Sequence, residues 1–400
     1  MSISGLFTIG LSGVNAFSQS LETVSNNIAN SQTTGFRRAV TEFSTLASNN
    51  AVGGGIEGGG VDATAQTQVS EQGAITRTSV TTNLAIAGNG FFVVSQADDG
   101  AAAPDELSFT RAGDFSLTED GALENAGGFR LFGATITGNG NAAAGSLASL
   151  SEISIDAEQS LSAPTQTLTI AGQISQDTPI GEGITRQVSI INQAGVAQSL
   201  NVSLQRSTAN AFQANIFAEG DADTPVATGS VVFDPQGNVD PNLTTLPTNL
   251  ATPSPIAIDI AGLITGEGET QFSEFSADGV ASGIFTGLEI SQDGRITSTF
   301  SNGLREDQFQ IALANFISPE NLTDGPASTF LANSLAGDVQ IEIPLTGQSG
   351  GIEQSALELS TVDIAQEFSS LIETQRAYSA NTRVISVVDE LWERLNQTAT

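Results

Sequence analysis

The sequence predicts a mainly β protein with α-helical coiled-coil termini, built as a nested multidomain rod. Three observations lead to this prediction. Both ends of the 400-residue chain carry apolar residues at heptad spacing, which is typical of helices that pack along a seam. The interior consists of short runs with alternating apolar residues, as expected for strands, and glycines and prolines separate these runs. We therefore expect two β-rich domains and one paired domain of N- and C-terminal helices.

The N-terminal element is a predicted helix over about residues 4–28. Two apolar rows interleave here with alternating gaps of four and three residues, and only Gly10 interrupts them with a small residue. A glycine costs about 1 kcal/mol relative to alanine inside a helix, so we expect this helix to be disordered in the free subunit and to form when its seam is buried. The predicted seam is Ile3, Phe7, Val14, Phe17, Leu21, Val24 and Ile28.

The C-terminal element is a predicted helix of about 35 residues that begins near Ser360. Asp363 follows three residues later, close to a capping box, and no glycine or proline interrupts residues 352–400. The seam either forms the core of a helical hairpin within one chain or joins subunits. We favour the joint between subunits, because a two-helix hairpin leaves much of each apolar stripe uncovered. The predicted positions on this helix are Ile364, Phe368, Leu371, Tyr378, Ile385, Val388, Trp392 and Leu395, with Val384 and Leu391 as a second row.

The interior divides by composition. Eight of the twelve prolines lie between Pro164 and Pro255, and similar strand patterns occur on both sides of this stretch, so it reads as an insertion. Asp120-Gly121 and Asp293-Gly294 are predicted turns. The expected domains are a terminal helical core domain (1–28 with 360–400), an extended linker (29–75), an inner β-domain (76–145 with 285–359) and an outer inserted β-sandwich or barrel domain (146–284).

Composition excludes several classes of function. The net charge is −32 and all twelve cations are arginines, so we expect no nucleic-acid binding and no binding to anionic membranes. The chain has no histidine and no cysteine, which removes histidine-based catalysis and the usual nitrogen and sulfur metal ligands. No apolar run is long enough for membrane insertion, and no basic region precedes a cleavable signal. We predict no catalytic residue, no metal and no cofactor.

Two polar motifs have a functional and a structural interpretation. The glycines at 53–55 and 58–60 resemble a phosphate cradle, but they lack the following Gly-Lys-Ser/Thr and read better as a flexible joint. Asp234, Asn238 and Asp240 suggest calcium, but their spacing fits a hairpin turn better. A competing enzyme class is a secreted β-rich glycan hydrolase that uses two carboxylates.

Five stretches together resemble the flagellar axial protein family, which comprises rod, hook and hook-associated subunits, and the resemblance is closest to the hook branch. They occur in the family's order and cover the ends of the chain and both halves of the inner β-domain, whereas residues 146–284 carry no such motif. They are LETVSNNIANSQTTGFRRA (21–39), NLAIAGNGFFVV (83–94), FTRAGDFSLTEDGAL (109–123), FSNGLREDQFQIALANF (300–316) and STVDIAQEFSSLIETQRAYSANTRVI (360–385).

The resemblance implies a structural subunit rather than an enzyme. Such subunits are exported unfolded by the flagellar type III export apparatus without a cleaved signal. They polymerise with copies of themselves beneath a hook cap protein, between distal rod and hook–filament junction proteins. The implied product is a hollow, flexible tube in the flagellar hook and basal body, outside the cell, that transmits motor torque to the filament. A distal-rod or hook-associated subunit is the alternative within the family.

Overall fold

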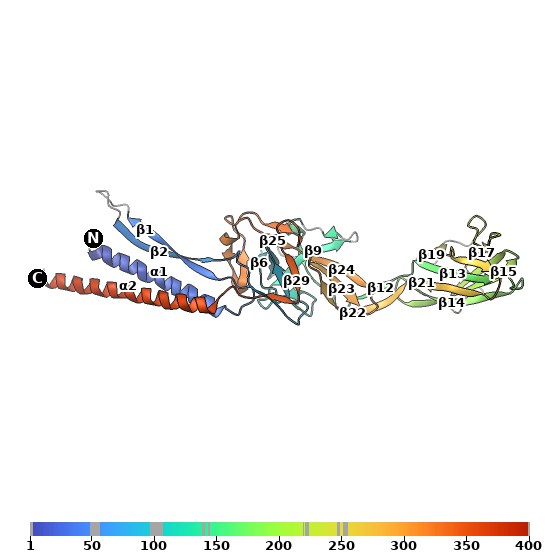
Figure 1. Cartoon of the computed structure of the whole chain (residues 1–400), viewed down its shortest axis with the longest axis horizontal. Helices are drawn as coiled ribbons and strands as arrows, with labels where there is room; N and C mark the ends of the chain where they lie inside the picture. The colour runs from blue at the N-terminus through green and yellow to red at the C-terminus, as the bar shows by residue number, and fades with distance from the viewer. Residues whose placement is uncertain are drawn as a thin grey trace. The chain divides into compact units, whose positions relative to one another are not determined.

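The computed structural model describes residues 3–48, 57–96, 107–137, 141–142, 145–218, 220, 224–245, 249–250 and 255–398. Most of them are in β-strands or the turns between strands, and two long helices, α1 (Ile3–Ala29) and α2 (Ile364–Thr398), lie at the two ends of the chain (Figure 1). The predicted fold class, mainly β with helices at the termini, is confirmed.

The chain forms two compact units. The terminal unit contains residues 1–156, 288–297 and 307–400, and the inserted unit contains residues 157–287 and 298–306. The chain crosses between the units four times. It crosses once between Asp156 and Ala157 and once within each of the strands β22 (Val280–Ile290), β23 (Arg295–Phe300) and β24 (Arg305–Ile311). The helices and the inner β-structure therefore belong to one unit, where the sequence predicts separate domains.

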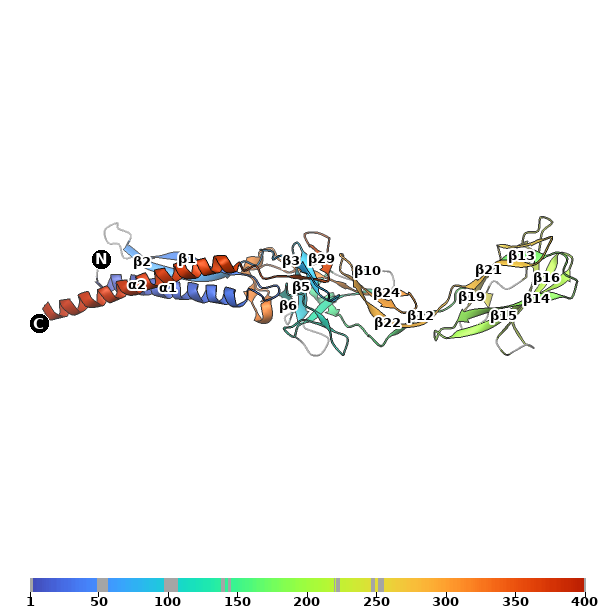
Figure 2. The same cartoon turned by 60° about the horizontal axis from the view of Figure 1, so that its bottom comes forward.

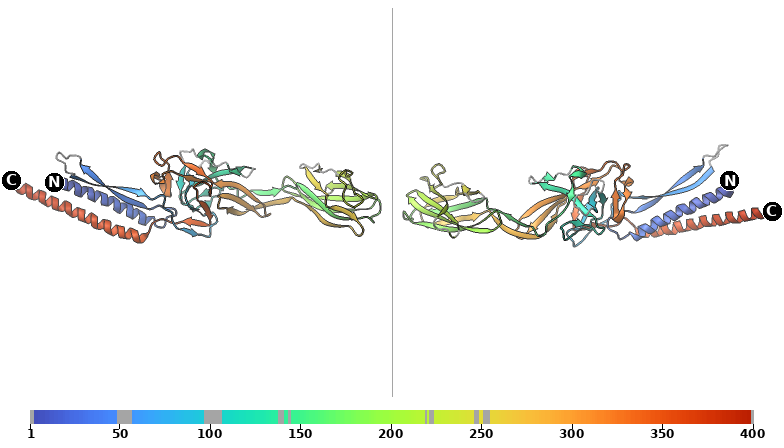
Figure 3. Two further views of the ribbon diagram at one scale, coloured as in Figure 1. Left: turned by 45° about the horizontal axis from the view of Figure 1, so that its top comes forward. Right: turned by 180° about the vertical axis from the view of Figure 1, so that it is seen from behind.

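The two helices run side by side in opposite directions within the terminal unit (Figure 3). α1 extends one residue beyond the predicted span at each end, and α2 is 35 residues long, as expected. The predicted cap of α2 is wrong by three residues. The carboxylate of Asp363 accepts hydrogen bonds from the backbone N–H groups of Ala365 (2.8 Å) and Gln366 (3.2 Å), whereas Ser360 accepts one only from Val362 (3.3 Å). Asp363 is the N-cap because its side chain reaches the first free helical N–H groups.

Residues 39–67 form a β-hairpin rather than part of an extended linker. β1 (Ala39–Ser48) and β2 (Glu57–Thr67) pair antiparallel and pack along α1 (Figure 2). The linker prediction failed because Val40, Phe43 and Leu46 recur at every third position, which hides the two-residue period of a strand. The glycines at 58–60 lie in β2, and those at 53–55 lie outside the described residues.

The inner β-structure of the terminal unit joins segments from both sides of the insertion. β5 pairs with β6 and β9 on its own side and with β25 from the far side, and β3 and β4 pair with β30 and β29. The remaining pairs include β25 with β28, β27 with β6 and β26, and β9 with β8, β10, β11 and β24. The strands are β3 (Ile75–Arg77), β4 (Leu84–Ala87), β5 (Phe91–Ser95), β6 (Ser108–Thr110), β7 (Ser116–Leu117), β8 (Leu123–Glu124), β9 (Arg130–Thr137), β10 (Asn141–Ala142), β11 (Ser151–Glu152), β25 (Leu313–Asn315), β26 (Thr323–Asp324), β27 (Thr329–Leu331), β28 (Gln340–Glu342), β29 (Gly351–Gln354) and β30 (Ala356–Glu358).

Aromatic side chains fill this core. The ring of Phe91 lies 5.8 Å from that of Phe330, and the ring of Phe109 lies 4.9 Å from that of Phe316. Both pairs meet edge to face, the geometry that aromatic pairs prefer. The predicted Asp120-Gly121 turn is confirmed between β7 and β8, where Gly121 has a φ of +84°.

The inserted unit contains two sheets, one antiparallel and one mixed, with one core between them. One sheet has the order β14-β15-β16-β17, and the other is built around β13. Both contribute buried apolar residues, including Leu168, Val202 and Phe212, so the unit is a β-sandwich. Its strands are β12 (Ser160–Ala163), β13 (Thr167–Ser175), β14 (Gly183–Ile191), β15 (Ala197–Thr208), β16 (Ala211–Ala218), β17 (Pro225–Val232), β18 (Asn249–Leu250), β19 (Ile256–Asp259), β20 (Leu263–Gly266) and β21 (Gln271–Ala277).

Candidate assembly surface

At three positions of its contact with α2, α1 contributes a small residue. A Cβ atom added at Gly13 would lie 2.6 Å from Oδ1 of Asn381, so the absence of a side chain at Gly13 leaves room for the Asn381 side chain between the helices. The three positions fix the antiparallel register of the helices: Gly10 beside Ile385, Gly13 beside Asn381, and Ser20 beside Thr374, whose hydroxyl lies 3.4 Å from that of Ser20.

Large apolar side chains lie on the outside of the helix pair. On α1, Phe7 and Leu11 are exposed, and on α2, Val387 is 55% exposed and Trp392 is 52% exposed. Groups of exposed large apolar side chains of this kind mark an interaction site. The exposed set on α2 is Ile364, Phe368, Ile372, Val384, Val387, Leu391 and Trp392.

These side chains on α2 face two directions. At about 100° per residue, Ile364, Phe368 and Ile372 fall on one side of the helix. Val384, Val387 and Leu391 fall on another side, roughly 130° around the axis. The N-terminal and C-terminal halves of α2 therefore expose apolar side chains on two different sides of the helix.

The residues of the predicted seam differ in how far they are buried. Val24 and Val388 are buried, while Phe7, Ile364, Phe368 and Trp392 are exposed. The helices contain Ile3 and Leu395, whose side chains lie outside the described residues. The partly buried members are Val14, Phe17, Leu21, Ile28, Leu371, Tyr378 and Ile385.

Strict heptad counting missed part of this surface. Leu11, Ile372 and Val387 are exposed on the helices, and Phe43 and Leu46 are exposed on β1. The helical ones stand three or four residues from predicted positions, so a search with the 3.6-residue period would have found them. The two on β1 carried no recognisable strand pattern.

Side-chain hydrogen bonds hold the hairpin against α1. Asn27 is buried and donates from Nδ2 to the carbonyl of Ala39 (2.7 Å), while the N–H of Ala39 donates to Oδ1 of Asn27 (3.0 Å). Further along, the N–H of Val61 donates to the hydroxyl of Ser12 (3.1 Å). The hairpin is therefore part of the same surface as the helices.

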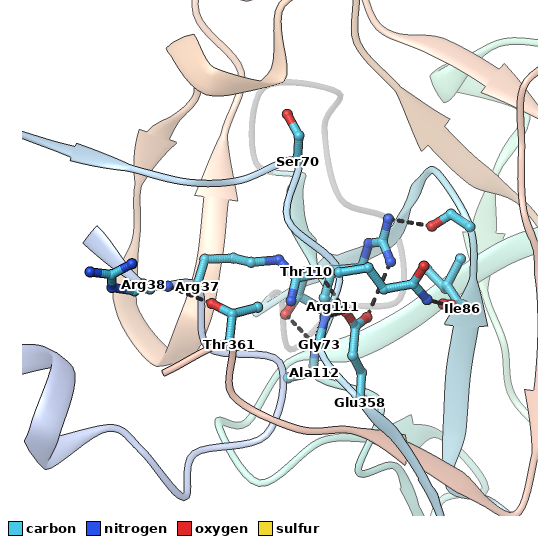
Figure 4. Close-up of polar contacts among 12 residues, drawn as sticks. Arg37, Arg38, Ser70, Gly73, Ile86, Thr110, Arg111, Ala112, Glu358 and Thr361 are labelled. Carbon is cyan, nitrogen blue, oxygen red and sulfur yellow. Dashed lines mark hydrogen bonds and ion pairs between the residues drawn. The ribbon is translucent and has the colours of Figure 1, made fainter. Parts of the chain in front are cut away.

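A buried ion cluster anchors the roots of both helices. Glu358, at the end of β30 and shortly before α2, is fully buried between Arg37, which follows α1, and Arg111, which follows β6 (Figure 4). Its carboxylate lies 2.7 Å from Nη2 of Arg37 and 3.1 Å from Nη1 of Arg111, and it also accepts a hydrogen bond from the N–H of Gly73 (2.7 Å). One acid thus binds three segments that are far apart in the sequence.

This cluster holds two cations on one carboxylate away from water. Burial lowers the pKa of Arg111 to about 10, Glu358 opposes that change, and the nearby charge of Arg37 adds to it. The value is far above 7, so Arg111 stays charged at neutral pH. Beside the cluster, Arg38 pairs with the buried Glu367 of α2 at 2.5 Å. The sequence signal was the rare pair of adjacent arginines at 37–38.

Other candidate sites gain no support from the described residues. Asp234 to Asn238 form a turn in which Asp234 Oδ1 accepts hydrogen bonds from the N–H groups of Gln236 and Asn238, so the turn interpretation is confirmed. Within the described ranges, no group of three or more acidic residues is arranged to hold a metal ion. No helix in the part of the chain that the structure describes is long and apolar enough to cross a membrane.

Comparison with known proteins gives three family matches. Residues 7–37 match the family described as "Flagella basal body rod protein", and residues 85–176 match the "Flagellar hook protein FlgE/F/G D1 domain". Residues 353–398 match the "Flagellar basal body rod FlgEFG protein C-terminal" family. The first and last matches fall on the two helices that carry the exposed apolar surface.

Three relatives of the chain match over nearly its full length, and each is a flagellar hook protein FlgE. The chain is 33% identical to the flagellar hook protein FlgE of Rhizobium meliloti over 417 residues, which cover 99% of each chain. It is 32% identical to FlgE of Brucella suis over 407 residues, again 99% of each chain. It is 25% identical to FlgE of Salmonella typhimurium over 411 residues, 97% of this chain and 98% of that one. The solved structure of the Helicobacter pylori flagellar hook protein FlgE2 aligns over 71% of this chain and all of its own, with 13% identity and a TM-score of 0.49.

Proposed function

The chain belongs to the flagellar hook protein family, and on that premise we propose that it polymerises through the apolar side chains that α1 and α2 expose. It is a structural subunit of the bacterial flagellar hook, a family whose members polymerise into the hook together with other flagellar components. The observation that carries the proposal is that α1 contributes small residues to the contact within the chain, while several large apolar residues of both helices remain exposed.

The physical reason is the burial of apolar surface. Moving one valine, leucine or phenylalanine side chain out of water stabilises an interface by about 1.5–3 kcal/mol. The exposed set on the two helices supplies several such side chains per subunit, enough to offset the freedom lost on association. Because α2 exposes them in two directions, one subunit meets different neighbours through different surfaces, and such heterologous contacts generate an open helical polymer.

The same observation suggests how a tube of these subunits bends. The terminal helices would form its tight inner wall through apolar contacts. The inserted unit closes an apolar core of its own, so although it exposes some apolar side chains such as Val196, its contacts with neighbours would be more polar and able to slide. Such a tube transmits torque while it flexes, as a universal joint between motor and filament must.

Family membership also supports the further partners in this proposal. The subunit would pass unfolded through the flagellar type III export apparatus without a cleaved signal. It would then add to the growing hook beneath a hook cap protein, on distal rod proteins and below the hook–filament junction proteins. A straight, rigid polymer would instead favour a rod subunit, but the full-length relatives favour the hook.

The test compares two valines of nearly equal exposure. Val387→Ser removes an apolar side chain from α2, and Val196→Ser makes the same change on the inserted unit, where Val196 is 57% exposed. Purified chains are concentrated in a precipitating salt, sedimented and viewed by negative-stain electron microscopy. We expect tubes from the parent chain and Val196→Ser, and a critical concentration raised about tenfold or more for Val387→Ser. Equal assembly of all three would contradict the proposal.

A further inference from the structure

Trp392 is the single tryptophan of the chain and lies near the C-terminal end of α2. It points to the side of α2 that packs on α1 at Thr374 and Asn381, since these positions lie at similar angles around the helix. In the register of the helix pair, position 392 is level with the start of α1 at Ile3, so α1 gives it little cover and half of the side chain is exposed. A tryptophan left partly uncovered in this way is a strong candidate for an interface anchor.

A pocket of about 350 Å³ lies at the other end of the helix pair, where α1, α2 and β1 meet. Phe17, Val40 and Phe43 supply its apolar lining, and the rings of Phe17 and Phe43 lie 5.3 Å apart. Arg38 and Glu373 supply polar groups at the same pocket. Aromatic rings beside a guanidinium suit an indole, which stacks on rings, attracts cations to its face and donates one N–H hydrogen bond.

The pocket and Trp392 of one chain cannot meet each other. Thr374 lines the pocket and lies 18 residues before Trp392 on the same straight helix, which places them about 27 Å apart along its axis. The indole can therefore reach such a pocket only on a second copy. That contact joins two different surfaces of the chain, and repeating it in one direction along the helices gives an open polymer.

We propose that Trp392 of each subunit inserts into the pocket between α1, α2 and β1 of a second copy. The inference rests on the proposed function, because it names one contact of the polymer that the exposed apolar surfaces build. In this contact Trp392 lies at the far end of one helix pair and the pocket lies near the root of the next one. The subunits therefore stack head to tail with a stagger along the helices.

The fluorescence of the lone tryptophan reports the insertion directly. In polymer collected by sedimentation, we expect the emission maximum to move to shorter wavelength and quenching by acrylamide to fall relative to the free subunit. Sedimenting polymer with unchanged emission and quenching would overturn the insertion and leave the proposed function standing. Absence of any sedimenting polymer would overturn the proposed function and this contact together.

Crosslinking tests the partner of Trp392, since the chain has no cysteine of its own. Asp389→Cys and Ser370→Cys place thiols near the indole and at the pocket, too far apart on one helix for a short bismaleimide to join within a chain. We expect the double variant to give a ladder of covalent oligomers. Mixed single variants should give dimers, and each single variant alone should stay monomeric on a denaturing gel.

The matched control replaces Ser370→Cys by Ser369→Cys, one residue along and about 100° around the helix. We expect the ladder to weaken strongly, because Ser370 lines the pocket and Ser369 does not. Equal ladders from the two double variants, or dimers from Asp389→Cys alone, would overturn the head-to-tail contact. Ala377→Phe, which fills the pocket from its lining, should also abolish the shift in emission.

Discussion

The terminal helices and the inserted sandwich handle their apolar residues in opposite ways. In the sandwich, Leu168, Val202 and Phe212 point into a core that two sheets of the same unit close. On the helices, Phe7 and Val387 remain on the surface, and Gly13 makes the internal contact. The sandwich is therefore a self-sufficient fold, whereas the helices need neighbours to bury their apolar surface.

The difference suggests where each part of the sequence is constrained. Alternation along the strands of the sandwich serves the single chain, so its contacts with other subunits are free to be polar. The pattern on the helices has to serve both the pair and the polymer. Small residues on one side permit the close helix contact, and large residues on the others offer surface to other copies.

The largest expected effect comes from the ion cluster at the helix roots. Glu358→Ala leaves Arg37 and Arg111 buried without a counter-charge, so we expect the terminal unit to lose about 3–5 kcal/mol of stability. Thermal unfolding should then show a lowered transition for the terminal unit and an unchanged one for the sandwich. Asp307→Ala, which removes an exposed partner of Arg295, is the control and should cost about 0–1 kcal/mol. Equal losses from the two substitutions would show that the cluster does not anchor the unit.

A smaller effect is expected at the contact between the helices. Gly13→Leu introduces a side chain where a Cβ alone would lie 2.6 Å from Oδ1 of Asn381, which should cost about 1–3 kcal/mol of helix pairing. Since each 1.4 kcal/mol is a tenfold change, the critical concentration for polymer should rise by about 5- to 150-fold. Ser25→Ala, on an exposed part of α1, should leave it unchanged. An unaffected Gly13→Leu chain would mean that the helices do not pair closely in the polymer.

The smallest effect separates two possible caps of α2. Asp363→Ala removes the acceptor for the N–H groups of Ala365 and Gln366 and should cost about 1 kcal/mol, or roughly a fivefold rise in critical concentration. Ser360→Ala should change it less than about twofold, because that hydroxyl does not cap the helix. A larger effect of Ser360→Ala than of Asp363→Ala would show that Ser360 caps the helix, as the sequence predicted.

Periodicity predicted both helices and the strands of the sandwich, because their apolar residues repeat at one period over long stretches. Residues 168–170 and 212–216 alternate without interruption, and the structure buries their apolar members. The hairpin at 39–67 was not predicted, since Val40, Phe43 and Leu46 follow a three-residue spacing. The hairpin is held on α1 by a hydrogen bond that Asn27 donates to Ala39 and one that the hydroxyl of Ser12 accepts from Val61. A local pattern carries no trace of such contacts from another element.

The assembly surface was predicted in outline only. Heptad positions located the helices and several exposed residues, but they could not say that Gly10 and Gly13 make the contact between helices while Val387 stays outside. The cluster of Glu358 with Arg37 and Arg111 joins residues more than 200 positions apart. Only the fold brings such charges together, so the sequence alone gave no reason to pair them.

Hydrogen exchange on the free subunit and on the polymer tests the central claim most directly. We expect amides of α1 and α2 to exchange rapidly in the free subunit and to become protected in the polymer. Amides of β15 in the sandwich should be protected in both, because that core needs no neighbour. If α1 were as strongly protected as β15 in the free subunit, and gained nothing on polymerisation, the helices would be complete without neighbours and the account would be wrong.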